Sequence, residues 1–462
     1  MIKDRDLLLR QITENIAKTD FSGYTIQYPP MFSWSKIDDA MIRKYWLRLI
    51  KNNNVSQCGL YVHIPFCKTK CNFCRYFSVE LKESSMVDDY LNYLNMEAGI
   101  LKLSFNRTKI RTLYIGGGTP AILEYGQLLK LFKIIYEHFD LSRCVQICFE
   151  GNSEFLDYKK LRILKQSNVN RLTMGIQSLD RKVVKAANRT QDLKLVHKAY
   201  LNARRAGLEY INIDLMACLP HQTTESFLRD IEEVISWRPD MVHIHPFYPT
   251  PDTQFSEDGS ILSKKDMDRR EEMSYFGSKL LSSVGYKNIK LDAMGLDDKV
   301  RNVQLSDAIE YNAPYLGIGC GAVSHITGFA RYANFNNLNK YYLSLTKNRL
   351  PILSGCKLNK KSEMIYFITA CLKNGKVSKQ RFFKLFHEDI DKIFPKEIEY
   401  LEERGIIVNN RSFILSRLRN IGEYLIFSKY FYENSIVKLM GEEFNSKART
   451  NISDLESKYM CL

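Results

Sequence analysis

The sequence predicts an α/β protein in which parallel strands alternate with helices. Short apolar runs recur at intervals of about 30 residues through the middle of the chain, and each is followed by a stretch with helical spacing. The same runs end in glycine or in polar residues. Because parallel β/α units bind ligands at the carboxyl edge of the sheet, these strand ends are candidates for a site.

Five strands are expected in this region. Each is a short run of mostly apolar residues bounded by polar residues or glycine. The expected strands are Thr112–Ile115, Gln146–Glu150, Arg171–Gly175, Tyr210–Leu215 and Met241–Phe247. Periodicity alone leaves open whether their sheet is open or closed.

The last part of the chain has a different pattern. Helices are predicted over Glu363–Leu372, Ser378–Phe386 and Ile398–Glu403, and a hairpin is predicted around Gly405–Asn410. A last helix is expected from Ser416. Because the helices mix acids with bases, a lid over a substrate is favoured above DNA binding.

The composition suits a protein with a large buried core that does not cross a membrane. Hydrophobic residues make up 45% of the chain and charged residues 26%, and there is no apolar run of about 18 residues. Lysine and arginine number 67 against 52 acids, but they are dispersed, which favours a solvated basic surface over a nucleic-acid site. The odd count of 11 cysteines and the lack of a signal peptide indicate a cytoplasmic protein.

Three closely spaced cysteines form the strongest chemical signal. Cys67, Cys71 and Cys74 are separated by three and then two residues. Four-iron clusters normally take four cysteine ligands, so three would leave one iron open to another molecule. Zinc is the weaker alternative, because no second cysteine pair follows. The remaining cysteines are expected mainly in the core: Cys58, Cys144, Cys148, Cys218, Cys320, Cys356, Cys371 and Cys461.

Polar groups at the strand ends suit a charged nucleoside. Glu150 and Asp214 are carboxylates that could receive hydroxyl or ammonium groups, Gln177 offers an amide, and Arg189 offers a forked cation. Taken singly, each is as easily a helix cap or a surface charge. Gly116–Gly118 would let a ligand approach the backbone, although a tight turn explains the glycines equally well.

The motifs together resemble a known family. Tyr61–Cys74 resembles the radical S-adenosylmethionine (radical SAM) superfamily, in its oxygen-independent coproporphyrinogen III oxidase-like branch, which includes related heme-degrading enzymes and class C methyltransferases. The likeness continues, over about residues 24 to 440, through Gly116–Pro120, Asn170–Ser178, Asn188–Arg189, Asn212–Met216 and Leu219–Pro220.

The resemblance implies a partial (β/α)6 TIM-like barrel with a mainly helical, winged-helix-like C-terminal domain. The expected divisions are an N-terminal extension (1–54), the barrel with its substrate loop (55–350), the C-terminal domain (351–445) and a mobile tail (446–462).

The resemblance also implies the cofactors. Cys67, Cys71 and Cys74 would be the catalytic ligands of a [4Fe-4S] cluster, and two SAM molecules would lie side by side. Reduced flavodoxin or ferredoxin would supply the electron that cleaves SAM to a 5′-deoxyadenosyl radical. The implied SAM-binding residues are Tyr61, Phe73, Gly117, Gly118, Thr119, Glu150, Gln177, Arg189, Asp214 and Val323. Arg331, Tyr332 and Asn334 either meet substrate or cap their loop.

Three departures from the oxidase pattern favour methyl transfer. Cys74 is followed by Arg75 rather than by Gly-Cys-Asn, Glu150 is followed by Gly151 rather than by Ile-Asp-Pro, and Asp292 is followed by Ala293 rather than by His-Phe-Ala. We therefore expect a class C methyltransferase-like enzyme whose second SAM donates its methyl group to an sp2 carbon of a planar substrate, such as heme or an aromatic natural-product precursor.

Two alternatives remain. One is an oxygen-independent coproporphyrinogen III oxidase, which carries out an oxidative decarboxylation in heme biosynthesis; the segment Tyr24–Pro30 and the run Asn188–Gln191 resemble its motifs. The other is a heme-binding or trafficking protein. A small planar substrate is the expected partner, with neither nucleic acid nor membrane.

Overall fold

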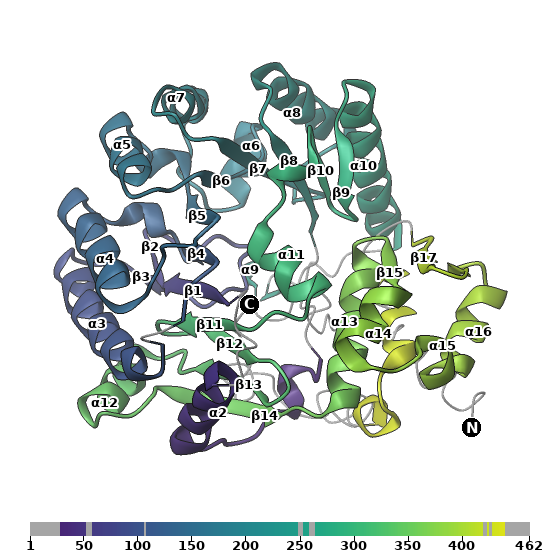
Figure 1. Cartoon of the computed structure of the whole chain (residues 1–462). Helices are drawn as coiled ribbons and strands as arrows, with labels where there is room; N and C mark the ends of the chain where they lie inside the picture. The colour runs from purple at the N-terminus through teal and green to yellow at the C-terminus, as the bar shows by residue number, and fades with distance from the viewer. Residues whose placement is uncertain are drawn as a thin grey trace.

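The computed structural model is a curved α/β sheet backed by helices, with a second domain at its open side (Figure 1). It describes residues 28–51, 58–105, 108–247, 253–257, 264–418, 423–424 and 427–438. The expected tail after residue 445, and all of the Tyr24–Pro30 motif before Tyr28, lie outside these ranges.

Seven neighbouring strands of the main sheet run parallel. Their order is β11-β1-β4-β5-β6-β7-β8, and six of them follow the chain from β1 to β8 as in a partial (β/α)6 barrel. These strands are β1 (Gly59–Ile64), β4 (Thr112–Gly117), β5 (Gln146–Gly151), β6 (Arg171–Gln177), β7 (Tyr210–Ala217), β8 (Met241–Pro246) and β11 (Tyr315–Ile318). All five predicted strands are confirmed, and their apolar side chains are buried between sheet and helices.

Antiparallel strands extend the sheet at both ends, so the barrel is open. On one side β10 (Ala293–Gly295) and β9 (Lys287–Lys290) follow β8. On the other, β12 (Val323–Ile326), β13 (Ala330–Asn334) and β14 (Ile352–Lys357) follow β11. The sheet therefore runs past the expected domain boundary at residue 350 to Lys357.

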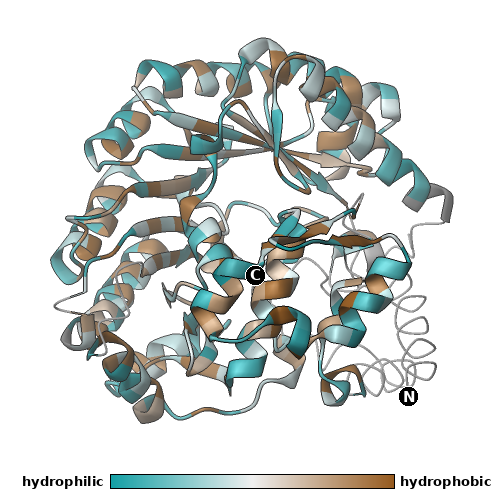
Figure 2. Ribbon diagram, turned by 45° about the vertical axis from the view of Figure 1, so that its right-hand side comes forward, coloured by the Kyte–Doolittle hydropathy of each residue, from teal (hydrophilic) through white to brown (hydrophobic). Residues whose placement is uncertain are grey.

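Helices cover the convex face of the sheet, where Figure 2 shows polar residues outward and apolar residues toward the strands. Three of them begin at an aspartate that accepts a backbone N–H at the helix start: Asp157, Asp180 and Asp192. The covering helices are α3 (Ser85–Phe105), α4 (Tyr125–His138), α5 (Tyr158–Gln166), α6 (Arg181–Ala186), α7 (Leu193–Arg205), α8 (Thr224–Trp237) and α10 (Lys264–Ser283).

Shorter elements join these units. They are α2 (Asp39–Lys51), β2 (Phe66–Cys67), β3 (Val79–Glu80), α9 (Gln254–Glu257), α11 (Val303–Glu310), α12 (Leu338–Thr346) and the 3-10 turns η1 (Met31–Ser33), η2 (Pro120–Ile122), η3 (Ser153–Phe155), η4 (Asp298–Val300) and η5 (Ser428–Phe431). Within the described ranges, no helix combines the length and the apolar character needed to cross a bilayer.

The C-terminal domain has the helix and wing order that the sequence predicts. A three-stranded sheet, β15-β17-β16, packs with the helices around its own core of Phe367, Phe382, Phe386 and Ile414. The elements are α13 (Lys360–Lys373), β15 (Lys376–Ser378), α14 (Lys379–Phe386), α15 (Ile390–Ile393), α16 (Pro395–Glu403), β16 (Ile407–Asn409) and β17 (Phe413–Ser416). Ser416 ends the wing strand, and the residues where the last helix was expected are only partly described.

Buried contacts fix this domain to the sheet. Glu363 of α13 accepts hydrogen bonds from the Nε2 of His325 on β12, at 3.1 Å, and from the backbone of Gly328, at 2.6 Å. The guanidinium of Arg331, on β13, is stacked 3.8 Å from the ring centre of Tyr366. These contacts hold α13 of the C-terminal domain against β12 and β13.

Candidate active site

One cavity of about 1360 Å³ lies at the carboxyl edge of the parallel strands and reaches the C-terminal domain. Every residue that the sequence analysis singled out for the cluster or for SAM lines it. These residues are Tyr61, Cys67, Cys71, Phe73, Cys74, Gly117, Gly118, Thr119, Glu150, Gln177, Arg189, Asp214 and Val323.

The three cysteines lie on a loop that begins at the end of β2. Burial, together with the neighbouring Cys71 and Cys67, raises the pKa of Cys74 to about 12. Burial also raises the pKa of Cys67. Thiols in such surroundings become thiolates when a metal centre displaces their protons. Cys371 of α13 also lines the cavity, but its thiol points to the carbonyl oxygen of Ile309 at 3.8 Å.

Backbone contacts hold this loop against the segment after α6. The N–H of Asn72 donates to the carbonyl oxygen of Ala187 at 3.1 Å, and the side chain of Asn188 donates to the carbonyl oxygen of Lys70 at 3.0 Å. Asn188 has the left-handed backbone angle (φ 54°) that asparagine tolerates better than most residues. The cysteine loop is therefore positioned by the Asn188-Arg189 motif.

The glycines at the end of β4 allow this segment to approach the cysteine loop closely. A side chain at Gly118 would place its Cβ 2.7 Å from the carbonyl oxygen of Phe66 and 3.0 Å from the sulfur of Cys67. The hydroxyl of Thr119 lies 3.5 Å from the same sulfur. Close approach to the cysteine loop, rather than a turn alone, explains these glycines.

Arg189 joins the cysteine loop to the sheet. Its Nη1 donates to the sulfur of Cys71 at 3.6 Å, and its Nη2 donates to the carbonyl oxygen of Gly175 at 2.6 Å. Among the described residues its Nε is buried without a hydrogen-bond partner. A buried cationic donor beside a thiol fits an anionic ligand there, such as a carboxylate.

Glu150 and Gln177 present their side chains at neighbouring strand ends. Tyr114 donates a short hydrogen bond to Glu150, and burial raises the pKa of Glu150 to about 7. Gln177 has a left-handed backbone angle (φ 70°) where the pairing of β6 with β7 shifts register. Such a conformation is costly for a residue with a side chain and is typical of functional sites.

These features fit a [4Fe-4S] cluster with SAM. Three thiols share one loop, a glycine-rich edge leaves room beside them, and Arg189 offers a buried unpaired donor. Soft thiolates are the usual ligands of iron-sulfur clusters. Tyr61, whose hydroxyl contacts the Nδ1 of His63 at 2.8 Å, completes the nearby wall.

Two histidines that were not predicted from the sequence, His243 and His245, lie beside Asp214 in the cavity wall. The Oδ1 of Asp214 lies 3.8 Å from the Nδ1 of His243 and 3.7 Å from the Nε2 of His245. Burial alone would raise the pKa of Asp214, but contacts with His245, His243 and Asn212 lower it to about 2. Burial lowers the pKa of His243 to about 3. The signal available in the sequence was the alternation His243-Ile244-His245, which points both imidazoles to one side of a strand.

The cavity as a whole has more basic than acidic side chains. Nine lysine and arginine side chains line the cavity against five aspartates and glutamates. Three of these cations, Lys373, Lys376 and Arg381, come from the C-terminal domain. This excess of positive charge suits a substrate that carries carboxylates.

Arg331, Tyr332 and Asn334 do not line this cavity. They are buried on β13, where Tyr332 accepts a hydrogen bond from Trp46 and Asn334 donates to Glu97. The structure therefore supports capping of their loop, rather than contact with substrate, as the role of these three residues. No disulfide forms among the described cysteines, and Cys58, Cys148, Cys218, Cys320 and Cys371 are buried.

Comparison with known proteins agrees with this geometry. Residues 61–234 match the Radical SAM superfamily. The heme chaperone HemW of Buchnera aphidicola is 30% identical over 271 residues, which cover 58% of this chain and 70% of that protein. The oxygen-independent coproporphyrinogen III oxidase of Escherichia coli is 27% identical over 436 residues, 88% of this chain and 93% of the enzyme.

A solved structure supports the same fold. The structure described as coproporphyrinogen III oxidase (HemN) from Escherichia coli, a radical SAM enzyme, superposes with a TM-score of 0.77 at 22% identity and covers 88% of this chain and 96% of that one. The chain therefore belongs to the radical SAM superfamily. Within it, the chain falls in the branch that contains HemW and the oxygen-independent coproporphyrinogen III oxidases.

The expectation of a class C methyltransferase is wrong. The relatives that match across most of the chain are HemW and coproporphyrinogen III oxidases. That expectation rested on the residues that follow Cys74, Glu150 and Asp292. Such short segments carry less information than the similarity of the whole barrel and C-terminal domain.

Proposed function

We propose that the protein is an oxygen-independent coproporphyrinogen III oxidase that decarboxylates propionate side chains of a porphyrinogen. The observation that carries this proposal is the single cavity with the cysteine loop on one wall and the cations of the C-terminal domain on another. A tetrapyrrole with propionates needs a large pocket and several positive groups, and this cavity provides both.

The residues of the cysteine loop would hold the cofactors. Cys67, Cys71 and Cys74 would ligate a [4Fe-4S] cluster, and the glycine edge with Arg189 would bind SAM. When bound, this pair supplies reductive cleavage of SAM to a carbon radical that removes hydrogen from the substrate. Two SAM molecules are part of the proposal, because the residues that the resemblance assigns to them, from Tyr61 to Val323, all line this one cavity of about 1360 Å³.

The protein's own groups would orient the reactants and exclude water. Glu150, held by Tyr114, would accept hydroxyl groups of SAM, and Lys376 would hold a substrate carboxylate on the wall formed by the C-terminal domain. The C-terminal domain forms one wall of this cavity, which would limit the access of water to a radical reaction. Reduced flavodoxin or ferredoxin is the proposed electron donor.

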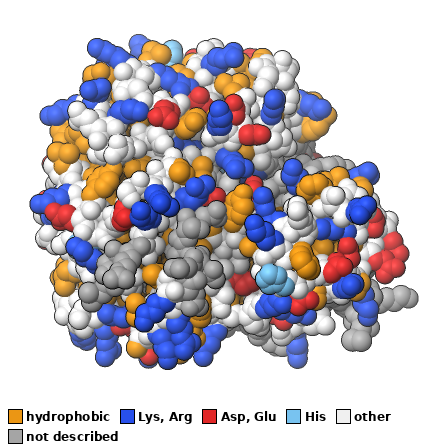
Figure 3. Space-filling view, viewed as in Figure 1, with side chains coloured by type: hydrophobic (Ala, Val, Ile, Leu, Met, Phe, Trp, Pro, Cys, Tyr) orange, Lys and Arg blue, Asp and Glu red, His pale blue; other side chains and the backbone are white. Residues whose placement is uncertain are grey.

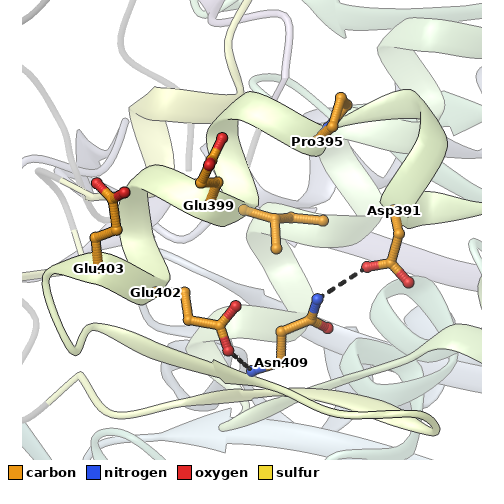
Figure 4. A pocket seen from close by; sticks show the side chains of 7 residues that line it. Asp391, Pro395, Glu399, Glu402, Glu403 and Asn409 are labelled. Atoms are coloured by element: carbon orange, nitrogen blue, oxygen red, sulfur yellow. Dashed lines mark hydrogen bonds between the residues drawn. The ribbon is translucent and has the colours of Figure 1, made fainter.

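A hollow on the outer side of the C-terminal domain is relevant to whether the protein binds a small molecule or nucleic acid. It has a volume of about 520 Å³ (Figure 4). It is lined by Pro395, Ile398 and Asn409 and by four acids, Asp391, Glu399, Glu402 and Glu403. Asn409 donates its backbone N–H to Glu402 at 3.0 Å and its side chain to Asp391 at 3.1 Å. Such an acidic surface repels phosphates, which supports a small-molecule substrate rather than nucleic acid.

The visible surface is consistent with this proposal. Figure 3 shows lysines and arginines spread among acids and apolar groups, without one continuous basic stripe on that face. A nucleic-acid site usually needs such a stripe.

Product analysis tests the function. The reconstituted protein is incubated without oxygen with SAM, a low-potential reductant and coproporphyrinogen III. We expect 5′-deoxyadenosine together with loss of carbon dioxide from the substrate, and neither product from Cys71→Ala. Tight heme binding with no decarboxylation would instead support the function named for HemW, and S-adenosylhomocysteine as the main product would contradict the proposal.

A further inference from the structure

Two imidazoles and one carboxylate converge on a point in the cavity wall. His243 and His245 lie two residues apart on β8, and Asp214 is the register partner of His243 on the neighbouring strand β7. Their ligand atoms, one from each residue, all lie within 4.8 Å of one another. The arrangement comes from rigid strands rather than from loops, so it is held in place by the sheet.

The spacing fits ligands around a small ion. The Oδ1 of Asp214 lies 3.7 Å from the Nε2 of His245 and 3.8 Å from the Nδ1 of His243. Both separations exceed hydrogen-bonding distance, and the same oxygen accepts a hydrogen bond from the side chain of Asn212 at 2.6 Å. With metal-ligand bonds of about 2.0–2.2 Å, neighbouring ligands of a tetrahedral ion lie about 3.4 Å apart. The two separations from Asp214 are a few tenths of an ångström longer than this, and the ligand atoms of the two imidazoles lie within 4.8 Å of each other, so binding of an ion would draw the side chains closer together.

An outer layer of groups supports the same interpretation. The second ring nitrogen of His243, Nε2, lies 3.1 Å from the Oδ1 of Asp292, an ion-pair contact in which neither atom makes a hydrogen bond to any described residue; a small rotation of the imidazole would be needed to form one. Asp292 is in turn 3.3 Å from the ammonium of Lys290 and 3.4 Å from that of Lys373. A carboxylate behind a histidine fixes which nitrogen is left for a metal and is the usual partner of metal-bound imidazoles.

We propose that Asp214, His243 and His245 bind a divalent first-row transition-metal ion, such as Zn²⁺, with an open coordination position toward the cavity. Two imidazoles and a carboxylate are borderline-hard ligands that such ions prefer. All three residues line the cavity, so an anionic oxygen of a bound molecule can complete the coordination. Binding of this ion does not depend on the proposed function.

The proposal changes the expected role of Asp214. By resemblance this carboxylate was assigned to SAM, but here its Oδ1 faces two imidazoles. In our proposal the Oδ1 of Asp214 binds the ion, and its Oδ2 remains available for the contact with SAM that the resemblance implies.

Metal titration tests this site without any assay of activity. The full-length chain carries Cys67→Ser, Cys71→Ser and Cys74→Ser, so that the cysteine loop neither absorbs light nor binds the probe. Co²⁺ is titrated without oxygen and followed by its d–d absorption, and Zn²⁺ is then added in competition. We expect one Co²⁺ per chain, displaced by Zn²⁺.

Substitutions in this background locate the site. His243→Ala and His245→Ala should each weaken Co²⁺ binding about 100-fold or more, and Asp292→Asn should weaken it about 10-fold as a partner behind the ligand. His221→Asn is the matched control, because His221 is exposed and asparagine tolerates its backbone angle (φ 65°). This control should bind as tightly as the parent.

Asp214→Asn provides a second test of the site in case the histidine variants do not fold. It keeps the side-chain shape and removes the charged ligand, and it should also lose Co²⁺ binding while circular dichroism shows a folded barrel. The proposal is overturned if the parent binds no Co²⁺ up to millimolar concentration. It is equally overturned if folded His245→Ala and Asp214→Asn bind Co²⁺ as tightly as the parent.

Discussion

The guanidinium of Arg189 donates a hydrogen bond to the sulfur of Cys71 across 3.6 Å. Through its other arm the same side chain is fixed to the carbonyl oxygen of Gly175, at the end of β6. A single side chain thus connects the cysteine loop with the sheet edge that presents Gln177. Its loss should disturb cluster and SAM binding together.

The first prediction concerns this contact. Arg189→Ala should lower the rate of SAM cleavage about 10- to 100-fold, since hydrogen bonds to charged groups contribute about 1.5–3 kcal/mol. Iron content and the amount of 5′-deoxyadenosine measure the effect. Arg181→Ala, at an exposed position of α6, should leave both unchanged. Full activity in Arg189→Ala would show that the arginine has no part in the site.

The second prediction concerns the cluster ligands. Cys71→Ala should abolish the visible absorbance of the cluster and all SAM cleavage, because three loop-borne thiolates leave no spare ligand. The barrel should stay folded, since its core is formed by apolar side chains elsewhere. Cys144→Ala, whose sulfur does not line the cavity, is the control. Continued production of 5′-deoxyadenosine in Cys71→Ala would refute the ligand assignment.

The third prediction is a pH dependence set by Glu97 of α3. Burial raises the pKa of this carboxyl to about 7, against the hydrogen bonds from Tyr341, Gly319 and Asn334 that lower it. The folded state therefore binds a proton that the unfolded state releases near pH 4.5, so the contribution of Glu97 to stability falls as pH rises from about 4.5 to 7.

Urea unfolding at pH 5 and pH 8 measures this dependence. Relative to the wild type, Glu97→Gln should gain up to about 3 kcal/mol in unfolding free energy between the two pH values, because one pKa unit corresponds to about 1.4 kcal/mol. Glu83→Gln, at an exposed position, should show no such change. A constant difference between Glu97→Gln and wild type would contradict the assignment.

The fourth prediction concerns the contact between the domains. Burial alone would raise the pKa of Glu363, but the charges of His325 and Arg331 and the N–H of Gly328 lower it to about 2. Its contribution to stability is present above about pH 4.5 and is lost as pH falls toward 2. At pH 7, Glu363→Gln should cost about 3 kcal/mol, since Arg331 then remains buried without a counter-charge.

Unfolding free energies at pH 7 and pH 3 check this prediction. The difference between wild type and Glu363→Gln should shrink at the lower pH. Glu399→Gln, on the exposed side of α16, should stay within about 0.5 kcal/mol of wild type at both. Equal costs for the two variants at pH 7 would show that the buried pair does not hold the domains together.

The fifth prediction concerns the cations of the C-terminal domain. Lys376→Glu should raise the KM for a carboxylate-bearing substrate about fivefold at low salt, and the effect should diminish as salt is added. The rate of SAM cleavage at saturating substrate should change little. Lys384→Glu places the same charge on the same domain but outside the cavity, and it should leave KM unchanged. Equal KM values in both variants would place substrate elsewhere.

The sequence predicted the repeating part of this structure well. Thr112–Ile115 and Tyr210–Leu215 are strands because apolar runs between polar ends suit buried parallel sheets. All the residues that resemblance assigned to cofactors reach one cavity, since parallel strands deliver their ends to one edge.

The parts that were missed depend on contacts between distant segments. His243 and His245 acquire chemical interest only when β8 lies beside Asp214 of β7 and near Asp292, and no local pattern encodes that pairing. The side chains of Lys376 and Arg381 face the cavity because a separate domain packs against the barrel. The error on methyl transfer had a similar origin, because local departures after Cys74 and Glu150 were weighed above similarity over the whole chain.

The division of the cavity between two domains has a consequence for biosynthesis. Cys67 leaves the ribosome about 300 residues before Lys376, and domains generally fold in order of synthesis. The cluster loop is therefore complete while the chamber around it still lacks a wall. Under the proposed function, substrate binding therefore has to wait until the C-terminal domain has been synthesised and has packed against the barrel.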